Sequence, residues 1–262
     1  MSLVEEDVIA RNITGEFYRP TRLYYKVCNQ SQVLDHFKRL ECIQYCETRN
    51  GYVWLYEKEA QDLHFENSYN RISEEYRPII LGWFSWKSKE DLVLDLRSSN
   101  RALHAIPFFH KYISEMLMKV THCAVVNKIF SLKEVISQSY FDQYFENNDQ
   151  MVIVDLEAGE THLKEFAEEV KNILAKNFSP ERIEEALTRF QKKGNDFFEI
   201  EKFPVFFYTD GIRSLESAFS MRNTIMLKRF LGEKDYSWTD LTNEMINKTK
   251  DSGSFFNRLT SY

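Results

Sequence analysis

Glycine and proline are scarce in this sequence, with 8 glycines and 5 prolines in 262 residues. Rossmann, P-loop and α/β-hydrolase proteins depend on glycine-containing motifs, and we find none of their spacing patterns here. The scarcity also argues against disorder, because disordered chains are rich in proline and glycine and poor in aromatics. Aromatic residues make up 15% of this chain, so we expect it to fold around a sizeable core.

The sequence also lacks the features of an exported or membrane protein. Its N-terminus has no basic region followed by an apolar stretch. The longest apolar stretches, Ile79–Trp86 and Phe203–Tyr208, are far shorter than the ~20 residues that span a bilayer. The chain has 4 cysteines, too few for a disulfide scaffold in 262 residues. We therefore expect a soluble cytoplasmic protein with reduced thiols and no membrane partner.

An excess of basic charge is absent as well. The chain has 34 basic and 40 acidic residues, and its formal net charge is −6. Proteins that bind duplex DNA without sequence preference usually carry a basic domain or stripe, so this function is disfavoured. A local basic patch that is assembled only on folding stays open.

Alternating apolar residues predict an α+β fold with a mixed, largely antiparallel sheet built from hairpins, with helices packed on it. Strands are expected at 22–28 and 120–126, and one hairpin is expected from 79–87 and 92–96. Asn50-Gly51 separates two further strand-like segments and predicts a two-residue type I′ turn.

Helices are expected to dominate the C-terminal half. Short strands at 151–157 and 203–209 are predicted to alternate with helices at about 160–176 and 211–231. In the first half, Ser31 is expected to start one helix, and Ser98 or Ser99 another that runs to about 118 with a kink or break at Pro107. We predict a single domain over 1–262. A subdivision near 145–150 would separate a hairpin-rich part (1–147) from a helix-rich part (148–262).

Acidic residues follow three of the predicted strands. Asp95, Asp155 and Asp210 each come at or just after the end of an apolar run, and Glu157 follows Asp155 closely. Hard cations such as Mg²⁺ prefer carboxylate ligands, and phosphoryl-transfer enzymes collect them from separate elements. If the strands are neighbours, these acids could form a catalytic Mg²⁺ site, with Asp95, Asp155 and Asp210 as metal ligands. Helix capping and ordinary ion pairs are the simpler explanation of the same residues.

A second candidate site is the segment that contains Arg97, Ser98, Ser99 and Arg101. It surrounds a predicted helix N-terminus, where free N–H groups and the helix dipole favour an anion. Arginine adds a fork of donors that matches phosphate or carboxylate. The alternative is a capping sequence in which an arginine pairs with Asp95.

The predicted hairpins also carry aromatic residues in alternation. Trp54, Trp83 and Trp86 could form stacking platforms for single-stranded nucleic acid, with nearby lysines holding the backbone. Cross-strand packing beneath a helix is the alternative.

The leading prediction is a binding, regulatory or assembly protein without its own catalysis, with another protein as its partner. It follows mainly from the lack of a strong catalytic motif. One alternative is a divalent-metal-dependent phosphohydrolase or nuclease that uses the strand-end acids, with Arg97 and Arg101 holding the phosphate. The second is a protein that binds RNA or single-stranded nucleic acid through its aromatic hairpins.

Overall fold

The computed structural model describes residues 8–146, 149–154, 198–205 and 211–244, together with scattered positions between 161 and 189. The chain divides into two compact units. The first comprises Met1–Val154 and Phe198–Phe219, and the second comprises Asp155–Phe197 and Ser220–Tyr262.

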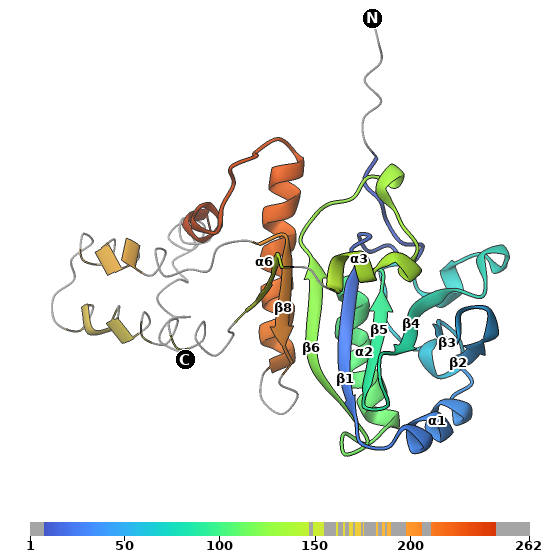
Figure 1. The fold of residues 1–262 in the computed structure, drawn as a ribbon. Helices are drawn as coiled ribbons and strands as arrows, with labels where there is room; N and C mark the ends of the chain where they lie inside the picture. Colours follow the sequence, from blue (N-terminus) through green and yellow to red (C-terminus); the bar gives the residue numbers. More distant parts are fainter. Residues whose placement is uncertain are drawn as a thin grey trace, which may run out of the picture. The chain divides into compact units, whose positions relative to one another are not determined.

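The first unit is built on an eight-stranded mixed sheet with the strand order β2-β3-β4-β5-β1-β6-β8-β7 (Figure 1). Neighbouring strands are antiparallel except β7 and β8, which are parallel. The α+β prediction is therefore confirmed. The strands are β1 (Thr21–Val27), β2 (Ile43–Cys46), β3 (Gly51–Leu55), β4 (Ile80–Trp86), β5 (Asp91–Leu96), β6 (Met118–Val126), β7 (Met151–Ile153) and β8 (Ile200–Pro204).

The helices that the structure defines are α1 (Gln30–Arg39), α2 (Ser99–Tyr112), the short α3 (Asp142–Phe145) and α6 (Gly211–Phe230). Figure 1 shows α2 on one side of the sheet and α3 on the other. Alternation along β1 fits this arrangement, since Leu23 and Tyr25 point to one face and Arg22 and Tyr24 to the other. Helix α2 covers the first of these faces, where Phe109 contacts Phe84 of β4 with ring centroids 4.9 Å apart.

Two helix predictions need correction. Asn29, and not Ser31, caps α1, because its side chain accepts a hydrogen bond from the backbone N–H of Gln32. Helix α2 continues through Pro107 as far as Tyr112, so proline does not end it. The helix was predicted to run to about 118, but it ends at Tyr112, and β6 begins at Met118.

The hairpin around Asn50 forms, but its turn differs from the prediction. Residues Glu47–Arg49 make one turn of 3-10 helix, and Asn50 alone takes a left-handed conformation with φ 47°. Gly51 already belongs to β3, opposite Cys46. A four-residue connection therefore replaces the predicted type I′ turn, because Asn tolerates the left-handed region without a following glycine.

Part of the second unit is also defined. Ile225, Tyr236 and Leu241 form a small apolar cluster with Met221 and Trp238 packed against it. Residues 238–244 are helical, and Ser237 caps them by accepting a hydrogen bond from the N–H of Asp240. Within the described ranges, no helix is long and apolar enough to cross a membrane.

Candidate anion-binding site

The residues predicted to bind an anion lie at the junction of β5 and α2. The helix begins at Ser99, and Ser98 is its N-cap. The hydroxyl of Ser98 accepts a hydrogen bond of 3.1 Å from the backbone N–H of Arg101. Both serines are buried, so the helix start faces the interior of the first unit.

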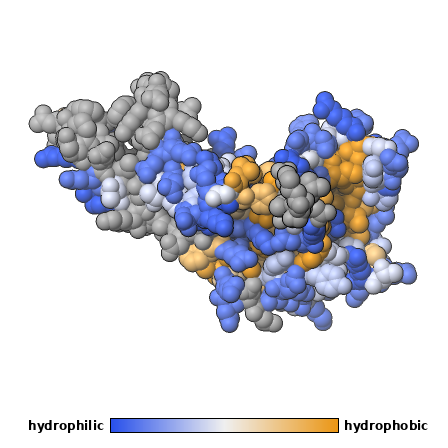
Figure 2. All heavy atoms as spheres, turned by 90° about the horizontal axis from the view of Figure 1, so that it is seen from above, coloured by the Kyte–Doolittle hydropathy of each residue, from blue (hydrophilic) through white to orange (hydrophobic). Residues whose placement is uncertain are grey.

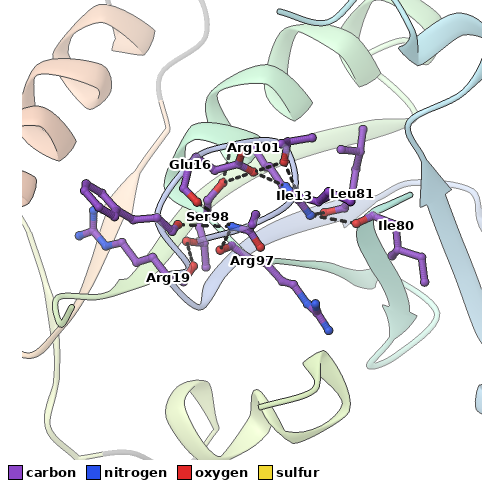
Figure 3. A network of polar contacts seen from close by, with 12 residues as sticks. Ile13, Glu16, Arg19, Ile80, Leu81, Arg97, Ser98 and Arg101 are labelled. Carbon is purple, nitrogen blue, oxygen red and sulfur yellow. Dashed lines mark hydrogen bonds and ion pairs between the residues drawn. The ribbon is translucent and has the colours of Figure 1, made fainter. Parts of the chain in front are cut away.

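An anion does lie beside this helix start, and it is the carboxylate of Glu16 (Figure 3). The Nε atom of Arg101 donates to Oε1 of Glu16 over 2.5 Å, and the hydroxyl of Ser98 donates to the same oxygen over 3.2 Å. Thr14 adds a third hydrogen bond of 2.8 Å to Oε1. The chain therefore supplies its own anion here.

Arg101 is buried, and all three of its guanidinium nitrogens donate hydrogen bonds. It is 1% exposed, and its Nη1 donates to the carbonyls of Ile80 and Leu81 over 2.9 and 3.1 Å. Its Nη2 donates to the hydroxyl of Thr14 over 2.7 Å. Burial lowers the pKa of Arg101, and the charge of Glu16 acts in the opposite direction. Arg101 thus joins the N-terminal segment to β4 and α2.

Ser99 belongs to a second buried network. Its hydroxyl accepts a hydrogen bond of 3.3 Å from Arg19, which also donates to the carbonyl of Val126 over 3.0 Å and to the side chain of Asn127. Asn127 in turn donates to Oε2 of the fully buried Glu201 over 2.5 Å. This network ties the segment just before β1 to α2, β6 and β8 at one end of the sheet.

Arg97 differs from these residues. Its backbone carbonyl is fixed by the N–H of Arg19 at 2.8 Å and the side-chain amide of Asn12 at 3.0 Å. Its side chain extends away from the Glu16 network, as Figure 3 shows. The Nε atom is buried and has no hydrogen-bond partner. Among the residues that the structure describes, none forms an ion pair with this guanidinium. Arg97 is therefore the member of the predicted site whose charge is unmatched there.

Tyr18 connects the segment before β1 to a neighbouring surface segment. Burial raises the pKa of Tyr18 to about 12, and the hydrogen bond with the backbone of Ile136 and the charge of Arg97 act in the opposite direction. The hydroxyl of Tyr18 donates to the carbonyl of Ile136 over 2.9 Å and accepts from its N–H over 3.2 Å. The side chain of Gln138 donates to the backbone carbonyl of Asp95 over 2.9 Å, so the end of β5 that leads to Arg97 lies beside the segment that precedes α3.

This segment exposes large apolar side chains. Val8, Leu132 and Val135 are 62%, 58% and 37% exposed. The N–H of Leu132 donates to the carbonyl of Val8 over 3.0 Å, which brings the two strips of backbone together. Figure 2, a view from above, shows apolar residues at the surface in several places. We call Val8, Arg97, Leu132 and Val135 the Arg97 surface.

Of the four predicted strand-end acids, the structure describes only Asp95. Asp155, Glu157 and Asp210 lie outside the described residues. Asp95 is 3% exposed, and its two oxygens accept hydrogen bonds of 2.6 and 2.9 Å from Arg22. A guanidinium lies where a Mg²⁺ ion would have to bind, so Asp95 does not fit the role of a metal ligand. Among the described residues, no group of three or more histidine, cysteine or acidic side chains could hold a metal ion.

The Arg22–Asp95 pair continues into a charged cluster that secures α3. Asp142 accepts from Arg22 over 2.6 Å and from Lys87 over 2.9 Å, and Glu146 also pairs with Lys87. Burial alone would raise the pKa of Asp142, but the hydrogen bonds from Lys87 and Arg22 outweigh it and lower the pKa. The cluster holds α3 on the sheet face opposite α2.

The aromatic residues predicted to stack nucleic acid lie in three different environments. Trp54 is fully buried beneath α2, with its ring centroid 5.3 Å from Phe108 and 5.0 Å from Phe109. Trp83 is 8% exposed and lies under the guanidinium of Arg49. Trp86 is partly exposed at the end of β4. Trp54 is thus not accessible to a base, and Trp83 and Trp86 point to opposite faces of β4.

The residues that sequence reasoning missed are Glu16, Arg19 and Arg22, which supply the partners of the predicted residues. No local pattern marks them, because each pairing crosses more than 70 positions of the sequence. No protein-family model, curated protein or solved structure matches this chain. Function is therefore inferred from the chemistry of the described residues.

Proposed function

We propose that this chain is a cytoplasmic protein that binds another protein through the Arg97 surface and has no catalytic activity of its own. The observation that carries the proposal is the exposure of Val8, Leu132 and Val135 on two backbone segments that the hydrogen bond from the N–H of Leu132 to the carbonyl of Val8 joins. Grouped apolar side chains on a protein surface often mark an interaction site.

The energetics favour a protein partner. Complete burial of one such side chain contributes about 1.5–3 kcal/mol, so three of them contribute enough to anchor an interface. Interfaces commonly combine a small apolar centre with an arginine, and Arg97 supplies the arginine here.

The other elements of the proposal have separate support. All four cysteines are free, which suits a reducing compartment such as the cytoplasm. The buried arginines Arg19, Arg22 and Arg101 are each satisfied by acceptors within the chain, which fits a structural role for these charges. The metal-dependent alternative rests on Asp155, Glu157 and Asp210, which are outside the described residues.

Site-specific photocrosslinking tests the proposal. A photoreactive phenylalanine analogue at Val135 should give a discrete covalent adduct in cells, and the substitution Leu132→Ser in the same chain should reduce it. Met116 is 81% exposed and lies between α2 and β6, so the analogue at that position is the matched control. Equal adducts at both positions, or no adduct at Val135, would contradict the proposal.

A further inference from the structure

We infer that Lys202 and His122 form a binding site for the phosphate group of a small organic phosphate ester. The two residues come from neighbouring strands of the first unit, β8 and β6. Neither of them belongs to the Arg97 surface, so this inference is independent of the proposed function.

The pairing of the strands brings these side chains together on one face of the sheet. Lys202 lies opposite Ala124 of β6, and Pro204 lies opposite His122. Lys202 and His122 are therefore diagonal neighbours, with Cα atoms ~7–8 Å apart. Tyr24 of β1 lies directly opposite His122 on the other side of β6. The Nζ atom of Lys202 is 4.1 Å from the centroid of the Tyr24 ring, so the three side chains form one cluster.

Helix α6 covers the opposite face of β8. Phe203 points away from the face of Lys202, and it contacts Phe219 of α6 with ring centroids 5.4 Å apart. Lys202 and His122 are both partly exposed. Ile153 of β7, which pairs with Lys202, is 65% exposed. A small molecule can therefore reach this part of the sheet.

The positive charge of Lys202 is unmatched within the described part of the chain. Its ammonium contacts the ring of Tyr24 and forms no ion pair there. Burial lowers the pKa of Lys202, and burial together with the charge of Lys202 lowers the pKa of His122. The hydroxyl of Tyr24 is buried and has no hydrogen-bond partner among the described residues. Polar groups left in this way often mark a place where a water molecule or an ion binds.

Acids on neighbouring elements already have other partners. Glu201 lies on the opposite face of β8, where its Oε2 accepts from Asn127 over 2.5 Å. Asp142 and Glu146 both form ion pairs with Lys87. The complementary negative charge is therefore expected to come from a ligand.

The surroundings favour a phosphate ester over other small anions. A phosphate monoester carries about −1.5 to −2 charge near neutral pH, whereas a carboxylate carries a single charge. The ammonium of Lys202 and an N–H of the His122 ring can both donate to its oxygens. The organic part of the ester can cover Ile153, which free phosphate would leave in water.

Isothermal titration calorimetry with phenyl phosphate tests the inference on the full chain. Lys202→Gln removes the charge and keeps a polar side chain. Lys111→Gln is the matched control, because Lys111 also contacts a tyrosine ring, with Nζ 5.0 Å from the centroid of Tyr112, but lies exposed on α2. Lys202 contributes no ion pair to the described part of the fold, so Lys202→Gln should keep the thermal unfolding midpoint of wild type.

Wild type and Lys111→Gln should bind phenyl phosphate equally well. Lys202→Gln should bind it at least about tenfold more weakly, as expected for the loss of one charged hydrogen bond. His122→Gln should also weaken binding, which tests the site without changing Lys202. Ile153→Ser should weaken the binding of phenyl phosphate and leave that of inorganic phosphate unchanged.

Three results would overturn the inference. They are no saturable binding to wild type, equal affinity of wild type and Lys202→Gln, and binding of benzoate as tight as that of phenyl phosphate. Inorganic phosphate that binds as tightly as phenyl phosphate would overturn the organic ester and identify free phosphate as the ligand. Each result can occur whether or not Val135 gives its covalent adduct, so the inference and the proposed function fail separately.

Discussion

Replacement of Arg101 by methionine should destabilise the first unit more than almost any other single change on a polar side chain. Methionine keeps part of the apolar stem of arginine and removes every donor. The change breaks the ion pair with Glu16 and the hydrogen bonds to Thr14, Ile80 and Leu81. It also leaves the carboxylate of Glu16, which is 11% exposed, without its cation.

The size of the effect follows from these contacts. Hydrogen bonds to charged groups contribute about 1.5–3 kcal/mol each, and removing one partner of a buried ion pair costs about 3–5 kcal/mol. Since these contributions are not additive, we expect Arg101→Met to lower the free energy of unfolding by about 3–5 kcal/mol. That is a large fraction of the ~5–15 kcal/mol that stabilises a typical domain.

Urea unfolding followed by tryptophan fluorescence measures this loss. The chain has 4 tryptophans, of which Trp238 alone lies in the second unit. A Trp238→Phe background therefore reports the first unit, which matters because two units need not unfold in one transition. Arg97→Met is the matched control. It loses no side-chain bond within the described residues, so the free energy of unfolding should stay the same or rise.

A loss below about 1 kcal/mol for Arg101→Met would refute the reasoning, because it would show that the buried ion pair is replaceable by an apolar side chain. An equal loss for Arg97→Met would refute it as well, since the two arginines would then not differ in their bonding.

Three further predictions concern the sheet and α2. Gly51→Ala should destabilise the fold, because the new methyl group would lie 2.6 Å from the carbonyl oxygen of Phe84 and 2.9 Å from Nε1 of Trp83; a lowered urea midpoint would show it. Trp54→Ala should cost about 3–5 kcal/mol by leaving a cavity beneath α2, and an unchanged melting temperature would contradict the burial of Trp54. Burial lowers the pKa of His104, so the unfolded chain binds the proton more readily than the folded one. The urea midpoint should therefore fall as the pH drops below the ordinary histidine value of ~6.5, and His104→Gln should flatten this dependence.

Local patterns in the sequence were sufficient to predict most of the strands. The hairpin of β4 and β5 and the Ser98 cap of α2 depend on residues a few positions apart, and the structure confirms them. Asn50 shows where local reasoning fails. The dipeptide Asn50-Gly51 is compatible with several kinds of turn between β2 and β3. Which turn forms depends on how β3 pairs with both of its neighbouring strands.

The partners of the polar residues could not be predicted in the same way. Alternation assigns Asp95 to one face of its strand, but it does not identify the element that covers this face. Arg22 lies 73 positions away, and Glu16 lies 85 positions from Arg101. The same holds for Trp54. Alternation along β3 assigned its side chain to one face of the strand, but the sequence did not show that α2 packs on that face.

The position of β8 in the sheet has a consequence for synthesis of the chain. Strand β8 pairs with β6 on one side and with β7 on the other, but it begins at Ile200, after the segment that belongs to the second unit. Until the ribosome has released that residue, β6 presents an open edge of up to 9 residues to other chains. A growing chain therefore stays vulnerable to edge-to-edge association while 155–197 is made, and a chain cut short before β8 should aggregate.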